Sequence, residues 1–369
     1  MKNQRLLSLD VFRGGTIAFM ILVNNPGTWA SIYYPLRHAE WHGCTPTDLV
    51  FPFFLFIVGV SIYLAFAKHG HQLNKDTILK ISKRTGLIFL IGLLLNWFPF
   101  YQTHISDLRI MGVLQRIALG YGLGALICLS FPPKKLLFVA AAILLGYWAL
   151  MGLTVADAPY SLENNFARQV DILLFGESHV YNGFGIPFDP EGLISTIPAV
   201  VTVMLGYLVG WRIKTLENKH VLVKELLFYG FIAIFLGWLW DKSFPINKAL
   251  WTSSYVLFSG GLASIGLGVM IEIVDIQNRK WFTKPFIVFG TNSLFAYVLS
   301  GLLANTMYYL ITWKDSEGEV QHLNSWLYSD VFQPILGDIN GSLMYAISFV
   351  FICWAITSIL YRKRIFIKV

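Results

Sequence analysis

Ten long apolar runs follow one another along the chain of 369 residues, and three of the segments between them are long: 24–47, 154–190 and 312–340. A run of roughly 18 apolar residues with few charges predicts a membrane-spanning helix. The predicted spans cover residues 7–23, 48–67, 84–100, 110–131, 136–153, 191–210, 222–240, 252–273, 286–311 and 341–361. The pattern therefore predicts an all-α fold, a polytopic transmembrane helix bundle of about ten spans.

Proline residues mark two of the predicted helix boundaries. Pro132 and Pro133 separate the fourth span from the fifth, because proline breaks a continuing helix. Thr45 and Pro46 precede the second span, where threonine caps a helix and proline fits its first turn. With no internal repeat, low-complexity tract or soluble region in the sequence, the simplest partition is one membrane domain over residues 1–369.

Composition agrees with lipid as the solvent of this chain. Hydrophobic residues make up 56% of it and charged residues only 13%, whereas soluble domains carry about 25% charged residues. The net charge of +7 comes from short basic clusters between apolar runs, without a nucleic-acid motif, so nucleic-acid binding is excluded. The three cysteines show neither a disulfide framework nor metal-ligand spacing, and no metal is predicted.

Basic residues fix the predicted orientation. With the N-terminus inside, we count 21 Lys and Arg residues on the inner side and 7 outside, which together account for all 28. The positive-inside rule then places the N-terminus and, after an even number of spans, the C-terminus in the cytoplasm. The first apolar run lacks a cleavage pattern and is read as a retained helix. We expect a multi-pass protein of a bacterial inner membrane.

The densest polar cluster lies just outside the first span, between Asn24 and Asp48. Two antiparallel neighbouring helices and their short connection would bring Asn24, His38 and Asp48 close together. A histidine near an amide and a carboxylate is a candidate general base, because its ordinary pKa is close to neutrality. A second interpretation makes His38 an interfacial histidine bound by the backbone, and His42 is an equal candidate on chemistry alone. Asp48 is also explained as a helix N-terminal charge.

Other polar residues within the spans have a functional and a structural interpretation. Arg116 lies at membrane depth, where an ionisable group usually faces a cavity or a partner such as Asp107. Arg84 ends a basic cluster that is either a topology anchor or a contact for phosphate. Arg13 can pair with Asp10 three residues earlier. A further pair, Asn292 and Ser293, fits interhelical hydrogen bonding as well as ligand binding.

At these residues the chain resembles the heparan-α-glucosaminide N-acetyltransferase family, including its bacterial relatives. The matching segments run in order over nearly the whole chain: 5–14, 23–24, 38–43, 48–52, 109–116, 189–192, 247–251, 292–293 and 361–366. The resemblance implies a membrane enzyme that takes acetyl groups from cytoplasmic acetyl-CoA. The acceptor would be the amino group of a glucosamine on the non-cytoplasmic side.

The resemblance also implies residue roles. His38 is the expected active-site histidine, with Asn24 and Asp48 as polar residues beside it, whereas His42 stands where relatives can have asparagine. The candidate cofactor-binding residues are Arg13, Arg84, Arg116, Asn292 and Ser293. The candidate acceptor-binding residues are Asp107, Asp189, Glu191 and Lys248, although helix capping also explains Asp189 and Glu191. Lysosomal members have a luminal N-terminal region and one further span that this chain lacks, so we expect a small amino sugar or short glycan as acceptor.

Several alternatives remain open at this point. His38 would either deprotonate the amine or carry the acetyl group covalently, Asp48 would hold its tautomer, and Asn24 would bind the thioester oxygen. A related O-acetyltransferase of a periplasmic glycan is one rival function. A sugar transporter is another, although such folds often show repeats and broken helices, which the sequence does not reveal. Membrane lipid is an expected partner, and a homodimer is compatible with the sequence.

Overall fold

A computed structural model describes residues 6–367 of the chain. Its long helices are α1 (Leu7–Asn24), α2 (Val50–Phe66), α3 (Lys75–Trp97), α4 (Val113–Ser130), α5 (Pro133–Leu153), α7 (Leu193–Thr215), α8 (Lys219–Trp240), α9 (Ser253–Met270) and α14 (Asp338–Arg362). The shorter helices are α6 (Phe166–Phe175), α10 (Thr283–Thr291), α11 (Ser293–Asn305), α12 (Leu323–Trp326) and α13 (Gln333–Leu336). The strands β1 (Thr312–Lys314) and β2 (Val320–His322) form one small antiparallel hairpin.

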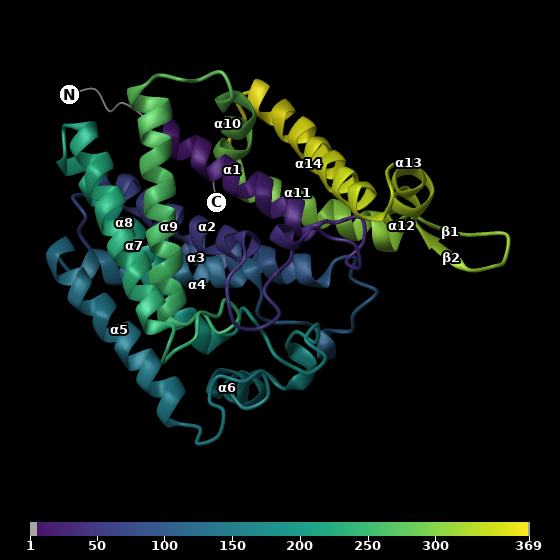
Figure 1. Cartoon of the computed structure of the whole chain (residues 1–369), viewed down its shortest axis with the longest axis horizontal. Helices are drawn as coiled ribbons and strands as arrows, with labels where there is room; N and C mark the ends of the chain where they lie inside the picture. The colour runs from purple at the N-terminus through teal and green to yellow at the C-terminus, as the bar shows by residue number, and fades with distance from the viewer. Residues whose placement is uncertain (1–5, 368–369) are drawn as a thin grey trace.

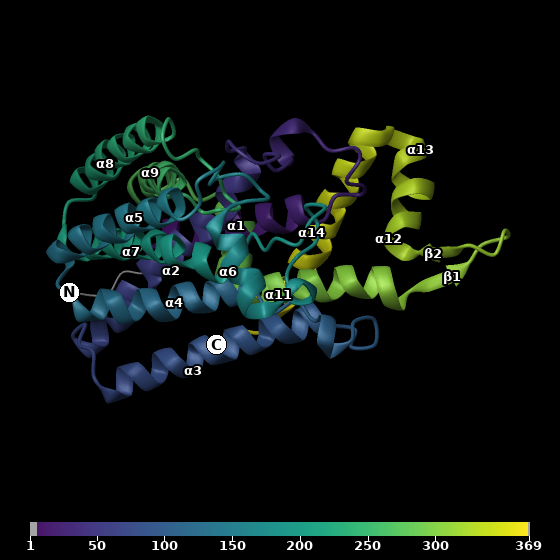
Figure 2. The ribbon, with the colours of Figure 1, turned by 90° about the horizontal axis from the view of Figure 1, so that it is seen from below.

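The helices pack into one bundle, and α8 lies beside α9 in both views (Figures 1 and 2). The β1–β2 hairpin projects from one end of the molecule beyond α12 and α13 (Figure 1). Apart from this hairpin the described fold is helical, which confirms the predicted all-α class. The hairpin lies in the long segment 312–340, and α6 lies in the long segment 154–190.

Helices α2 and α7 approach each other at glycines. A methyl group added at Gly59 of α2 would lie 1.9 Å from the Val203 carbonyl oxygen of α7, and one at Gly206 would lie 1.8 Å from that of Phe56. Lipid provides no hydrophobic driving force between helices, so such close backbone contact is how spans associate. Helices α2 and α7 are therefore in close backbone contact, and the turn that carries Asp48 directly precedes α2.

The number of spans is only partly confirmed. Within residues 6–367, eight helices are long and apolar enough to cross a membrane, and the bent pair α10–α11 makes a ninth. The predicted span 84–100 corresponds to α3, a helix of 23 residues. Lys80, Lys83 and Arg84 lie in its first half and interrupt its apolar stretch. The count of ten and the orientation of the termini therefore remain predictions.

The prediction of one continuous span over 286–311 is wrong, because α10 and α11 meet at an angle of 85°. The bend lies at Asn292, whose amide donates to the Ile365 carbonyl at 3.1 Å and accepts the Ile367 N–H at 2.9 Å. The side chain thus holds the C-terminal segment against the break. A break of this kind follows from local hydrogen bonding to a distant segment, which hydropathy does not report.

Candidate active site

His38 and Asp48 form a hydrogen-bonded pair in the loop between α1 and α2. Nδ1 of His38 lies 2.6 Å from Oδ1 of Asp48, whose side chain is 2% exposed while that of His38 is 39% exposed. An aspartate on Nδ1 favours the tautomer that carries its proton there. Nε2 is then left with a lone pair on the accessible part of the ring.

The local sequence explains how Asp48 is held. It is the third residue of the 3-10 turn Pro46–Leu49, and it forms a capping box with Thr45. Its Oδ2 accepts the N–H groups of Ala39 and Thr45, each at 3.0 Å, and its carbonyl accepts the Tyr255 hydroxyl at 2.6 Å. Asp48 therefore fulfils both predicted roles: Oδ1 binds His38, and Oδ2 caps the turn before α2.

A cavity of about 570 Å³ opens in front of this pair. Asn24, at the end of α1, lines it together with His38 and Asp48, so the three residues expected to meet do surround one space. Aromatic side chains form much of the remaining wall: Trp29, Trp41, Phe51, Tyr181 and Phe184. The sequence alone indicated no role in a site for these aromatic residues. Aromatic faces of this kind can stack against the apolar face of a sugar ring.

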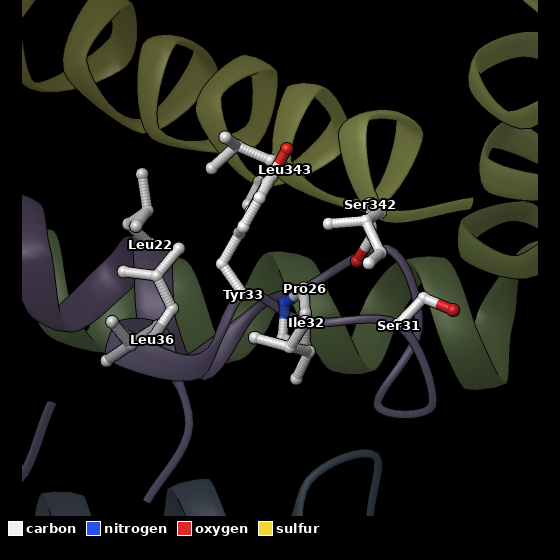
Figure 3. Close-up of a pocket in the computed structure, with 11 residues that line it drawn as sticks. Leu22, Pro26, Ser31, Ile32, Tyr33, Leu36, Ser342 and Leu343 are labelled. Atoms are coloured by element: carbon white, nitrogen blue, oxygen red, sulfur yellow. The ribbon is translucent and has the colours of Figure 1, made fainter. Parts of the chain in front are cut away.

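The segment that leads to His38 is fastened to the start of α14. The N–H of Gly27 donates to the Ser342 carbonyl at 3.2 Å, and the Tyr33 hydroxyl donates to Asn340 Oδ1 at 2.5 Å. Ser342 and Leu343 border a small apolar space beside Tyr33 and Leu22 (Figure 3). That space measures about 20 Å³, room for about one water. These contacts attach the segment to α14 at Gly27 and Tyr33, before it reaches His38.

Lys248 also belongs to this cluster. Its Nζ lies 3.2 Å from Nδ1 and 3.5 Å from Nε2 of His38, and 3.7 Å from Oδ1 of Asp48. The resemblance had implied a role for Lys248 in acceptor binding. The structure places its amine directly against the His38–Asp48 pair.

A buried ion cluster forms the opposite wall. Arg109 binds Asp189 through two nitrogens, at 2.9 and 2.7 Å, and Glu191 at 2.6 Å. Burial alone would lower the pKa of Arg109, but the hydrogen bonds and charges of Asp189 and Glu191 raise it. Glu191 lines the cavity, whereas Asp189 is buried by this pairing and accepts the N–H of Glu191. Asp189 therefore pairs with Arg109 and holds the turn before α7, but it does not cap that helix, whose N-cap Gly192 makes no side-chain bond. Glu191 keeps its candidacy for acceptor binding.

Arg116 does not reach either candidate ligand space. It is fully buried in α4, donates to the Gly192 carbonyl at 3.2 Å and to the Ser195 hydroxyl, and packs over the Trp251 ring. Arg116 lines neither cavity, so its assignment to cofactor binding gains no support and stays a prediction. The suggested pairing with Asp107 is wrong, because Arg116 bonds to Gly192 and Ser195 instead. Hydropathy marks a buried arginine but does not reveal its partners, which come from the start of α7.

Three other polar residues of the connecting loops lie away from the cavity wall. Asp107 is exposed and accepts the Ser106 hydroxyl at 3.2 Å, so its assignment to acceptor binding is not supported. His42 contacts Asn247 at 3.3 Å, and burial lowers the pKa of His42 despite the nearby Asp241 carboxylate. Burial and the Asp48 carboxylate raise the pKa of Cys44 to about 12, which leaves a neutral, poorly nucleophilic thiol.

A second cavity, of about 330 Å³, lies along the same helices at their other end. Arg13 of α1, Arg84 of α3 and Ser293 of α11 line it, so three of the five predicted cofactor-binding residues meet here. Arg13 donates to Ser61 at 2.7 Å, and Arg84 lies 4.6 Å above the ring of Tyr121. Ser61 and Tyr121 also line this cavity and were missed, because single polar or aromatic residues in apolar runs carry no distinctive signal.

Asn292 is adjacent to this second cavity without lining it. Its amide holds the C-terminal segment, and Ile367 of that segment does line the cavity. Asn292 therefore acts on the cavity wall, and its direct assignment to cofactor binding is not supported. Within residues 6–367, no group of three or more His, Cys, Asp or Glu side chains is placed to hold a metal ion.

Fold and site together define a polytopic α-helical membrane protein with a histidine–carboxylate pair in one cavity and arginines in another. Residues 5–176 match the family described as heparan-alpha-glucosaminide N-acetyltransferase, catalytic. The chain is 28% identical to the human heparan-alpha-glucosaminide N-acetyltransferase, over 99% of this chain and 60% of that protein. It is also 28% identical to the mouse protein of that name, over 86% and 57%. The resemblance to this family is thus confirmed, with the chain spanning about 60% of the human relative's length.

Proposed function

We propose that this protein is a transmembrane acetyltransferase that moves the acetyl group of cytoplasmic acetyl-CoA to the amino group of a glucosamine-type sugar on the other side of the membrane. The observation that carries the proposal is the His38–Asp48 pair at 2.6 Å inside a cavity of about 570 Å³. A space of this size accommodates a small ligand. The relatives' printed name, with its glucosaminide acceptor, supports the choice of acceptor.

The histidine supplies the base. With its Nδ1 proton directed to Asp48, Nε2 accepts a proton from the acceptor ammonium or amine as nitrogen attacks the thioester carbon. The same lone pair would attack that carbon in a covalent route through acetyl-histidine. Both routes need the tautomer that Asp48 maintains, so the pair supports either one.

Asn24 is placed to stabilise developing charge. It lies at the C-terminal end of α1 and lines the cavity with His38. An amide N–H directed at the carbonyl oxygen of the thioester would stabilise the oxyanion formed during attack, as oxyanion-hole donors do. Within the same cavity, the carboxylates of Glu40 and of Glu191, the latter also bound to Arg109, would bind the acceptor's ammonium or hydroxyl groups.

The second cavity is the proposed cofactor entrance. Arg13 and Arg84 offer positive charge to the phosphates of acetyl-CoA, which guanidinium groups bind well. Helix α2 lines both cavities, with Phe51 in the wall of the first and Phe54 in the wall of the second. These two positions differ by about 4.5 Å of helix rise. The pantetheine arm would pass along α2 from the second cavity to the first to bring the thioester to His38.

The test is transfer from radiolabelled acetyl-CoA to glucosamine by purified protein in detergent. We expect labelled N-acetylglucosamine from wild type and a rate lower by about 10²–10⁴-fold from His38→Ala, the contribution typical of a general base. His42→Ala is the matched control, because His42 is in the same loop but does not line the cavity. Full activity of His38→Ala would refute the assignment.

Two outcomes would redirect the proposal. Transfer to N-acetylated sugars instead of glucosamine would indicate an O-acetyltransferase. Sugar uptake into vesicles without acetyl-CoA would indicate a transporter, a reading that the 85° break between α10 and α11 favours. That break is filled by the chain's own residues Ile365 and Ile367, bound to Asn292, so we prefer the enzyme.

A further inference from the structure

The turn that carries Lys248 is fixed to the loop that carries His38. Asn247 donates to the Trp41 carbonyl at 2.8 Å, and the Gly43 N–H donates to the Ile246 carbonyl at 2.7 Å. Asn247 also accepts the Leu250 N–H at 2.8 Å, which closes the turn. Residues about two hundred positions apart are therefore held next to one another. These bonds keep the backbone of Lys248 beside the loop that carries His38 and leave its amine within reach of the His38–Asp48 pair.

The amine occupies the place where an acceptor amine is expected to react. Nζ lies 3.2 and 3.5 Å from the two ring nitrogens of His38, and Lys248 lines the same cavity as Asn24 and His38. The side chain is 23% exposed, so the amine is open to the cavity but largely removed from bulk water. A thioester brought to His38 would therefore also come within reach of Lys248.

The surroundings of Lys248 favour its neutral, nucleophilic form more than those of a surface lysine do. Burial, helped by Arg116, lowers the pKa of Lys248, although the Asp48 and Glu191 carboxylates oppose that shift. Desolvated lysines are known nucleophiles for this reason. The nearby Asp48 carboxylate favours the protonated amine of Lys248, which cannot attack a thioester. His38 lies beside the amine and can accept that proton, so the reaction is slowed but not prevented.

We propose that Lys248 is a site of self-acetylation, at which this protein modifies its own amine when acetyl-CoA is bound and no sugar acceptor fills the cavity. The proposal rests on the proposed function. Nζ of Lys248 attacks the thioester carbonyl carbon, a C–N bond forms and the C–S bond breaks. The proton of the amine passes to Nε2 of His38 and from there to the departing thiolate, which leaves as CoA–SH.

The modified form is expected to be inactive. Acetylation removes the positive charge that lies 3.7 Å from Asp48 and adds bulk to the cavity wall. An amide is also far less reactive than an acetylimidazole, so the group on Lys248 is not passed on to a sugar. The reaction therefore competes with normal transfer, and a bound amino sugar protects the enzyme from it.

The experiment incubates the purified full-length protein in detergent with radiolabelled acetyl-CoA and no acceptor. Peptide mass spectrometry then locates any added acetyl group after neutral hydroxylamine, which removes acetyl from histidine but not from lysine. We expect stable label at Lys248, suppressed by glucosamine, absent in Lys248→Arg and slowed about 10²-fold or more in His38→Ala. Lys242→Arg, in the same connection between α8 and α9, is the matched control and keeps the label.

The outcomes separate the two proposals. Transfer to glucosamine without label on Lys248 overturns the self-acetylation alone. Label spread evenly over Lys242 and other lysines, and unaffected by His38→Ala, identifies chemical acetylation and also overturns it. Absence of both transfer and label overturns the proposed function together with this inference. Because the principal result is read from wild-type protein, it does not depend on the folding of any variant.

Discussion

The two cavities of this protein differ in the kind of charge they hold. The wall of the first combines a histidine, carboxylates and a lysine, with Asp48 close to Lys248 and Glu191 paired to Arg109. The wall of the second, among the residues described, contains Arg13 and Arg84 but no carboxylate, and Arg13 also pairs with Asp10 at 3.3 Å. Proton transfer needs acids and bases fixed against one another, whereas phosphate binding needs an excess of positive charge.

Their construction differs as well. Loops and the short turn before α2 supply the reactive groups of the first cavity, and hydrogen bonds to the backbone hold them. Helices α1, α3 and α11 supply the polar groups of the second. Loops on a rigid scaffold commonly carry reactive groups. We therefore expect substitutions in the first cavity to change the rate of chemistry, and those in the second to change cofactor affinity.

The largest expected effect is a loss of kcat when Asp48, in the first cavity, is replaced. Asp48→Asn keeps the shape of the side chain but presents an amide to Nδ1 of His38, which favours the wrong tautomer. We expect kcat to fall by about 10³–10⁴-fold, with the KM for acetyl-CoA changed little. Steady-state kinetics with glucosamine measures both. A raised KM at unchanged kcat would place Asp48 in ligand binding instead.

The next effect concerns stability of the wall that faces His38. Arg109→Leu leaves the buried Asp189 carboxylate without its partner, and removal of one member of a buried pair costs about 3–5 kcal/mol. We expect a clearly lower Tm in detergent. Arg212→Leu is the matched control, because Arg212 makes the same two-pronged contact with Glu225 but both side chains are about 30% exposed. An equal decrease of Tm in the two variants would show that the Arg109 pair contributes no more to stability than an exposed ion pair does.

A smaller effect tests the second cavity. Arg84→Ala removes a charge-assisted contact to phosphate, worth about 1.5–3 kcal/mol, so the KM for acetyl-CoA should rise by about 10–100-fold while kcat at saturation is kept. Lys80→Ala is the control, because Lys80 is exposed and contacts His69 rather than the cavity. A loss of kcat at saturating cofactor would argue that Arg84 supports the fold instead.

The smallest effect is a pH dependence of stability near the first cavity. Asp171 of α6 accepts the Leu193 N–H at 2.9 Å, and burial raises the pKa of Asp171 to about 7. The unfolded chain releases this proton near pH 4, so Asp171 stabilises the fold at low pH and the contribution is lost as pH rises toward 7. Asp171→Asn should remove a slope of at most about 1.4 kcal/mol per pH unit. Tm values at pH 5 and 7 measure it, and equal slopes would contradict a raised pKa.

Much of the first cavity could be predicted from the chain alone. Asn24, His38 and Asp48 flank one short connection between two adjacent helices, so sequence proximity already implied spatial proximity. The binding roles predicted for Arg116 and Asp107 gained no support, because neither residue lines a candidate cavity. The sequence shows where a charged residue lies in a predicted helix or loop, but it does not show whether its side chain faces a cavity. Arg116 bonds to Gly192, far away in the chain, and Asp107 bonds locally, to Ser106.

Hydropathy, which depends only on the free energy of transferring each side chain, determined the helices, the lipid environment and the predicted spans. Local capping rules determined the turn at Thr45 and Asp48. Only the tertiary structure decided that Lys248 lies against His38, that Arg109 rather than Arg116 holds Asp189, and that Asn292 bends a predicted span. These features depend on contacts between residues far apart in the chain, and the side-chain periodicity of a single helix carries no information about its neighbour.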